Sequence, residues 1–163
     1  MVTARQKALV EASWGKVRPM ALSVAELFYD RLFELDPLLE DMFERELSKQ
    51  GPRLISAMGA LVMGLGDLES MLPIARDIGR PHVSYGVRTG HYTTFGKAWL
   101  WTLEQTLAEE FTPTVKDAWA AVYALVSSVM IEAAEGRDPA SIEPESSVHR
   151  LAPVARPGLR TAH

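Results

Sequence analysis

The sequence predicts an all-α protein, and three observations lead to that prediction. Apolar side chains recur at helical spacing in nearly every segment up to Asp138, which is the pattern of amphipathic helices. No segment shows the strict alternation of apolar and polar residues that marks a half-buried strand. Residues that favour helix starts, among them Thr3 and the pair Thr112-Pro113, stand just before periodic segments. We therefore expect about seven helices and no sheet.

The first half of the chain divides into four predicted segments. Thr3 is placed to cap a first helix. A second helix, about residues 18–35, is apolar on all but one stripe, so other helices should cover most of its surface. Asp36-Pro37 opens a short helix that ends near Phe43. Residues 44–49 are mostly charged or polar and indicate a corner between helices.

The second half continues the same pattern. One helix begins near Pro52, and Asp67 is placed to cap the next. The apolar stripe of that next helix consists of Met71, Leu72, Ala75 and Ile78, and His82 extends it by four residues. A long helix follows Gly90, and Thr112-Pro113 opens the last one.

Length and composition indicate one globular domain. The chain has 163 residues, of which 47% are hydrophobic and 23% charged, as in ordinary globular proteins. We expect a domain over residues 1–138 and a flexible tail, containing prolines and arginines, over residues 139–163, where the periodicity stops.

Charge and cysteine content exclude several functions. A net charge of −4 gives no reason to bind nucleic acid or an anionic membrane. The longest mostly apolar run, residues 54–65, is too short to span a bilayer, and the N-terminus has no signal-peptide pattern, so we expect a cytoplasmic protein. The absence of cysteine excludes disulfides, thiolate zinc sites, iron–sulfur clusters and covalent haem attachment.

His82 is the candidate functional residue with the most informative position. A lone histidine on an apolar stripe is usually a core residue, and His91 fits a hydrogen-bonded role at a helix start. Taken singly, Tyr29 is a buried tyrosine bonded to a carbonyl, Gln50 a surface residue and Phe43 a core residue. Together, a buried imidazole, an upstream polar pair and an aromatic side chain are the parts that hold and use a haem iron.

Three stretches carry a resemblance to the globin family. The segment that resembles the second and third globin helices is Phe28-Tyr29-Asp30-Arg31-Leu32-Phe33, followed by Asp36-Pro37 and Met42-Phe43. The segment that resembles the proximal region is Ile78-Gly79-Arg80-Pro81-His82, followed by Gly86-Val87 and His91-Tyr92. The segment that resembles the last two helices includes Phe111, Thr112-Pro113, Asp117-Ala118-Trp119 and Tyr123. The resemblance covers about residues 5–135 and is closest to single-domain bacterial haemoglobins and the globin domain of flavohaemoglobins, with neuroglobins also similar.

The resemblance implies a globin fold of about seven helices around a pocket for non-covalent haem b. It makes His82 the iron ligand and Tyr29 and Gln50 a pair of hydrogen-bond donors to the bound gas. The remaining implied pocket residues are Phe43 packed on the haem, Leu54 as an apolar ceiling, and Val87 and Phe95 along the haem edge and proximal side. Arg53 either reaches a haem propionate or is an ordinary solvated arginine.

Two departures from the family pattern bear on the iron ligand. Pro81 removes an amide donor directly before His82 and disfavours helical geometry at Arg80, so the helix should break there and restart. Flavohaemoglobins pair the proximal histidine with a tyrosine and a glutamate. Tyr92 matches the tyrosine, but the glutamate position falls on Ala134, which puts oxygen activation in doubt.

The sequence leaves two functions open. One is reversible, high-affinity binding of dioxygen for storage, delivery or scavenging, with carbon monoxide and nitric oxide as further ligands. The other is nitric oxide dioxygenase activity, which would need an external reductase, because the chain has no room for a flavin or nicotinamide domain. Ligation of ferric iron by Tyr29 or Gln50 also stays open. A haem sensor is disfavoured, because the tail is too short for an output domain. We expect a monomer or a weak homodimer.

Overall fold

A computed structural model describes residues 2–42, 47–82 and 86–136. Within these residues the protein is all-α, as predicted, and no strand is present. The six α-helices are α1 (Ala4–Val17), α2 (Ala21–Leu35), α3 (Leu47–Met63), α4 (Leu68–Gly79), α5 (Thr89–Leu107) and α6 (Pro113–Ala134). Five 3₁₀ turns accompany them: η1 (Arg18–Met20), η2 (Pro37–Met42), η3 (Gly64–Gly66), η4 (Arg80–His82) and η5 (Ala108–Glu110).

The predicted helix starts at Thr3, Asp67 and Thr112 are confirmed. Thr3 forms a capping box, in which the Gln6 N–H donates to Thr3 Oγ1 at 3.1 Å and the Thr3 N–H donates to Gln6 Oε1 at 3.0 Å. Thr112 Oγ1 accepts from the Val115 N–H at 3.3 Å at the start of α6. Asp67 has extended backbone before α4, and its carboxylate accepts from Ser70 Oγ at 2.6 Å, a bond that lowers the pKa of Asp67. Each start is therefore encoded locally.

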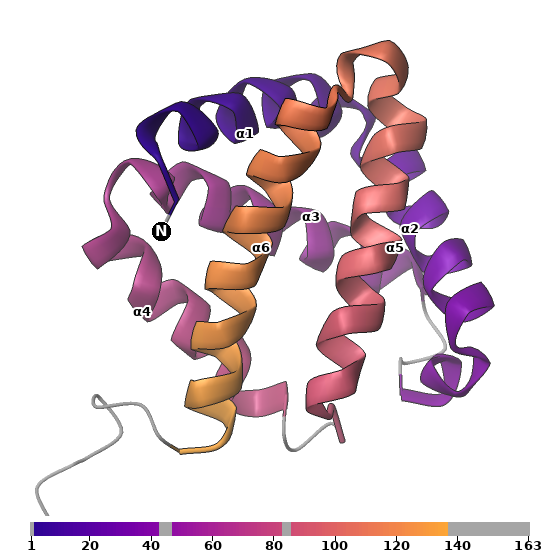
Figure 1. Ribbon diagram of the computed structural model, residues 1–163. Coiled ribbons are helices and arrows are strands. Elements are labelled where there is room, and N and C mark those ends of the chain that lie inside the picture. The colour runs from indigo at the N-terminus through magenta and orange to yellow at the C-terminus, as the bar shows by residue number, and fades with distance from the viewer. Residues whose placement is uncertain (1, 43–46, 83–85, 137–163) are drawn as a thin grey trace, which may run out of the picture.

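Figure 1 shows how the helices cross. α6 lies between α4 and α5, while α3 passes behind α6 and α1 crosses the upper end of α6. The most extensive contacts join α4 to α6, α2 to α5, and α1 to α6. Gly79 makes the α4–α6 contact close, because a Cβ there would lie 2.6 Å from backbone atoms of Met130.

The core is one cluster to which each of the six α-helices contributes buried side chains. Its largest fully buried side chains include Trp99, Phe28, Leu32, Leu65, Met71 and Leu103. α2 is buried on one face, at Val24, Ala25, Phe28, Tyr29 and Leu32. It is less covered than the sequence predicted, because Leu22 and Leu35 are exposed as well as its acidic residues. The exposed side of α2 includes Glu26, Asp30 and Glu34, three acidic residues at four-residue spacing.

Two boundaries differ from the sequence prediction. α3 begins at Leu47, so part of the expected corner and Gln50 itself belong to the helix, with Pro52 inside it. The Pro52 ring removes only a bond to the first turn, and the helix tolerates that loss. Before His82 the chain does not leave helical geometry, because Arg80 keeps φ −52° and ψ −48°. The helix instead tightens into the 3₁₀ turn η4, which contains Pro81 and His82.

α6 is long and apolar enough to cross a membrane by length and composition alone. The core helix of a folded domain passes the same test, and α6 packs against α1, α4 and α5.

Phe43 and the tail over residues 139–163 lie outside the described residues.

Candidate functional site

A cavity of about 440 Å³ opens among α2, α3, α4, η4, α5 and α6, within the range of about 300–1,000 Å³ typical of small-molecule and cofactor pockets. Most of its lining is aliphatic or aromatic. The polar side chains in the lining are Tyr29, Arg53, His82, His91, Tyr92 and Tyr123, together with the indoles of Trp99 and Trp119. The cavity is therefore apolar with a few polar groups.

His82 reaches the cavity from the 3₁₀ turn η4. Its ring stacks on Tyr92, with 6.1 Å between ring centroids and 25° between planes. Burial lowers the pKa of His82, and a hydrogen bond with the Ile78 backbone partly opposes that shift. The imidazole therefore stays neutral at neutral pH, and the neutral form is the one that binds metals. The Val87 N–H donates to the His82 carbonyl at 3.0 Å and so ties Val87 to the turn.

Tyr29 reaches the same cavity from α2 and is 5% exposed. Its ring meets the edge of Phe28 at 5.1 Å between centroids and stacks on Phe33 at 6.0 Å. Burial raises the pKa of Tyr29 to about 12, so its hydroxyl keeps its proton at neutral pH. Tyr29 thus provides an O–H donor in an apolar environment.

Tyr92 and Tyr123 connect α5 and α6 at the cavity wall. The Tyr123 hydroxyl donates to the Tyr92 backbone carbonyl. Gly96 makes room for the Tyr123 ring, because a Cβ at Gly96 would lie 2.5 Å from it. Burial raises the pKa of both tyrosines. The Tyr92 hydroxyl is buried without a hydrogen-bond partner among the described residues.

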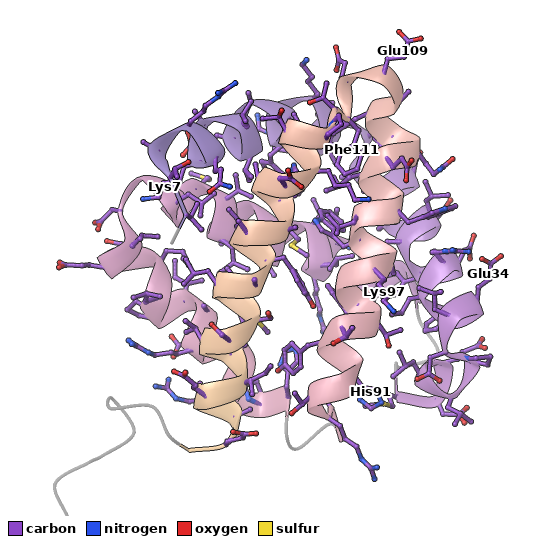
Figure 2. All side chains as sticks on the ribbon, viewed as in Figure 1. Lys7, Glu34, His91, Lys97, Glu109 and Phe111 are labelled. Atoms are coloured by element: carbon purple, nitrogen blue, oxygen red, sulfur yellow. The ribbon has the colours of Figure 1, made fainter. Side chains whose placement is uncertain are left out.

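His91 differs from His82 in its bonding. Its Nδ1 accepts from the Arg88 N–H at 2.9 Å, which places His91 in the first turn of α5 as a capping residue. Figure 2 shows His91 at this end of α5. The predicted role at a helix start is confirmed, and His91 also lines the cavity.

The structure brings most of the predicted site residues together. Those that line the cavity are Tyr29, Arg53, Leu54, His82, Val87, Tyr92 and Phe95. Phe43 lies outside the described residues, and Gln50 lies in α3 with a side chain that is also outside them. Lining a cavity does not test the role of a residue, so the ligand and donor roles remain predictions.

Sequence reasoning missed several cavity residues as site members. They include Leu61, Val62, Ile78, Val126, Met130 and Tyr123. The signal for most of them was present, because they belong to the apolar stripes that predicted α3, α4 and α6. Nothing in the stripes distinguishes a residue that faces a cavity from one that faces a neighbouring helix.

Comparison with known proteins gives three findings. A family model described as Globin matches residues 26–130. A flavohemoprotein of Bordetella parapertussis is 30% identical over 134 residues, which cover 80% of this chain and 33% of the relative. A neuroglobin of Danio rerio is 26% identical over 140 residues, which cover 77% of this chain and 88% of the relative. The chain thus spans about a third of the length of the flavohemoproteins that it matches.

A solved structure has the same fold. It is described as a hexacoordinated heme protein from an anhydrobiotic tardigrade at pH 4, and it superposes with a TM-score of 0.75 over 82% of this chain and 95% of the other. At 18% sequence identity this likeness concerns the fold alone.

Proposed function

The chain belongs to the globin family, and we propose that it holds haem b non-covalently in the cavity and binds dioxygen reversibly with high affinity. The observation that carries the proposal is that His82 and Tyr29, from separate elements, line one apolar cavity. Flavohemoproteins and a heme protein among the similar proteins support the same cofactor.

The residues present fit a haem group. A neutral imidazole is a common axial ligand of haem iron, and His82 is kept neutral by burial. Aliphatic side chains of α3 and α6, such as Leu61 and Val126, provide apolar surface for a porphyrin. Arg53 is exposed where it lines the cavity, which suits a contact with a haem carboxylate. Haem iron, once bound, supplies an open coordination position for a diatomic gas.

His82 would hold the iron, and the turn around it limits its motion. The Val87 bond to the His82 carbonyl and the stacking on Tyr92 restrict the backbone and the ring. The Tyr92 hydroxyl has no hydrogen-bond partner among the described residues. Ala134 stands where flavohaemoglobins have the glutamate that pairs with the proximal histidine. We therefore favour gas binding over oxygen activation.

Tyr29 would discriminate among gases. Its hydroxyl is protonated and its ring packs against Phe28, so it can donate to a ligand that carries partial negative charge. A hydrogen bond to a charged group contributes about 1.5–3 kcal/mol. Dioxygen gains more from such a donor than carbon monoxide does, because carbon monoxide develops less negative charge. Gln50, in the first turn of α3, is proposed as the second donor.

Replacement of Tyr29 by phenylalanine tests this function. Because the lost bond exists only in the bound state, Tyr29→Phe should raise the dioxygen off-rate by at least about tenfold and leave carbon monoxide release nearly unchanged. Stopped-flow displacement measures both rates. Tyr123→Phe is the matched control, since this cavity tyrosine already donates to the Tyr92 carbonyl, and it should leave the dioxygen off-rate nearly unchanged. An unaltered off-rate in Tyr29→Phe would make Tyr29 a structural residue and remove the high-affinity claim.

A second candidate is nitric oxide dioxygenase activity with a separate reductase. The similarity to flavohemoproteins favours it, and this chain covers only 33% of the first of them. The two functions differ in turnover. Stopped-flow mixing of the oxygenated protein with nitric oxide should give a single conversion without a reductase, and repeated conversions with one only if the protein is an enzyme.

A further inference from the structure

Gly79, the last residue of α4, lies directly against the backbone of α6, three residues before His82. A Cβ at Gly79 would lie 2.6 Å from the Cα and 2.6 Å from the carbonyl oxygen of Met130. Carbon atoms in contact stand about 3.5–4.0 Å apart, so any side chain at this position would have to push the two helices apart by about 1 Å. The end of α4 can therefore lie where it does only with glycine at this position.

The atoms that face Gly79 cannot turn aside as the end of a side chain can. Two of them are backbone atoms of Met130, inside the long helix α6. Gly64 provides the contrast, because the two atoms nearest to a Cβ at that position are side-chain atoms of Met71, at 2.8 and 3.0 Å. A side chain at Gly79 would thus have to be accommodated by movement of a helix.

Continuous helical backbone connects Gly79 to His82. Arg80 keeps helical φ and ψ angles, and its N–H donates to the Arg76 carbonyl. The turn η4 follows at once and itself contacts α6. A hydrogen bond with the Ile78 backbone also ties the His82 imidazole to the end of α4. A shift of this helix end would therefore carry the imidazole with it.

The contact between Gly79 and Met130 lies at the wall of the proposed haem site. Ile78, His82 and Met130 all line the cavity, whereas Gly79 does not. The His82 ring stacks on Tyr92 of α5, with 6.1 Å between ring centroids. The imidazole is thus placed by two helices, by α6 through Gly79 and by α5 through Tyr92. Functional groups must be held within about 0.5 Å of their productive position, and the expected displacement exceeds that tolerance.

We propose that Gly79 is a positioning residue, which sets how the His82 imidazole meets the iron of a bound haem by fixing the end of α4 on α6. The proposal rests on haem binding with His82 as the ligand, but not on which gas the protein carries. Gly79 acts through His82 alone, since it does not line the cavity. A larger residue at this position displaces the imidazole and changes the strength of its bond to iron.

Resonance Raman spectroscopy of the haem-loaded full chain tests the proposal. The iron–histidine stretching band is recorded directly after photolysis of the ferrous carbon monoxide complex, when the iron has one axial ligand. Gly79→Ala should shift this band. Gly64→Ala is the matched control, because it also introduces a close contact but neither Gly64 nor Met71 lines the cavity, so it should keep the parent band. An unshifted band in Gly79→Ala would overturn the proposal.

A second variant separates position from stability. Gly15→Ala in α1 adds a Cβ that meets nothing within 4 Å and should offset part of the stability that Gly79→Ala loses. The shifted band should persist when the two changes are combined, because the Cβ at position 79 is still present. Return of the parent band in the combined variant would mean that the shift only reported a loosened fold, and would overturn the proposal.

Removal of the tether tests whether the effect passes through His82. In His82→Gly supplied with free imidazole, the ligand of the iron is no longer joined to the backbone. Addition of Gly79→Ala to this variant should leave the iron–imidazole band where it was. A shift of equal size without the tether would overturn the proposal. Failure of the proposed function is recognised separately, because the parent protein would then lack the absorption band of bound haem, or His82→Gly would keep the parent iron–histidine band without imidazole.

Discussion

The two ends of α5 show how differently one helix can be packed. Toward its C-terminus, Thr102 and Leu103 are 0% exposed, and the Thr102 hydroxyl donates to the Ala98 carbonyl at 2.8 Å. Toward its N-terminus, Tyr92 and Phe95 line the cavity. In Figure 2, His91 marks the cavity end, and Phe111, just beyond the helix, marks the closely packed end.

This difference separates stability from function. Interiors packed like crystals lose contacts whenever a side chain is shortened, so the closely packed end should supply most of the stability of the haem-free protein. The cavity end has apolar walls that lack neighbours on one side and therefore contribute less. A bound group supplies the missing contacts. Binding of haem should accordingly stabilise the cavity end more than the rest.

The largest effect is expected from shortening a core residue, Leu103→Ala. Deletion of a fully buried leucine side chain costs about 2–5 kcal/mol, and Leu103 is 0% exposed. Leu54→Ala, on the cavity wall, should cost clearly less without haem and more once haem is added. Denaturant unfolding of both variants with and without haem measures the comparison. Equal penalties for the two variants in haem-free protein would contradict it.

An intermediate effect is expected where α4 touches α6. Gly79→Ala places a Cβ against Met130 backbone, and overpacking of this kind costs about 1–3 kcal/mol. Gly15→Ala in α1 is the control, because nothing lies within 4 Å of its Cβ position; it should stabilise the protein by up to about 1 kcal/mol. Thermal unfolding of both proteins gives the signs. Stabilisation by Gly79→Ala would show that the two helices can separate at no cost.

The smallest effect is expected from the tail. Truncation after Asp138 should leave the unfolding free energy and the dioxygen affinity nearly unchanged, because the segment lacks helical periodicity and contains many prolines. Calorimetry and oxygen titration measure this. A large fall in melting temperature would mean that the tail packs against the domain, and a change in molecular mass would mean that it mediates assembly.

Local sequence signals predicted much of the fold. Thr3, Asp67 and Thr112 mark helix starts because capping depends on residues three or four positions apart. The start of α3 at Leu47 was not predicted, because the polar residues 48–50 carry no apolar helical stripe. Tertiary packing can override such local preferences.

The candidate site divides in the same way. The apolar stripe that ends at His82 is a local pattern. It correctly predicted that the imidazole faces the interior, where His82 lines the cavity from the turn η4. The placement of Tyr123 over Gly96, and the meeting of Trp14, Trp99 and Trp119, depend on how separate helices cross. Such contacts between distant segments leave no periodic signal in a single sequence.

The central claim is that His82, and not His91, holds the iron of a bound haem. The two histidines line the same cavity, and the Nδ1 of His91 already accepts a hydrogen bond from the N–H of Arg88, the N-cap of α5. The most direct test is the absorption spectrum of the ferrous protein, with and without carbon monoxide, for His82→Ala and His91→Ala. His82→Ala should lose haem or retain it five-coordinate through a foreign ligand, while His91→Ala should keep the parent spectrum. A normal spectrum in His82→Ala together with lost haem in His91→Ala would contradict the assignment.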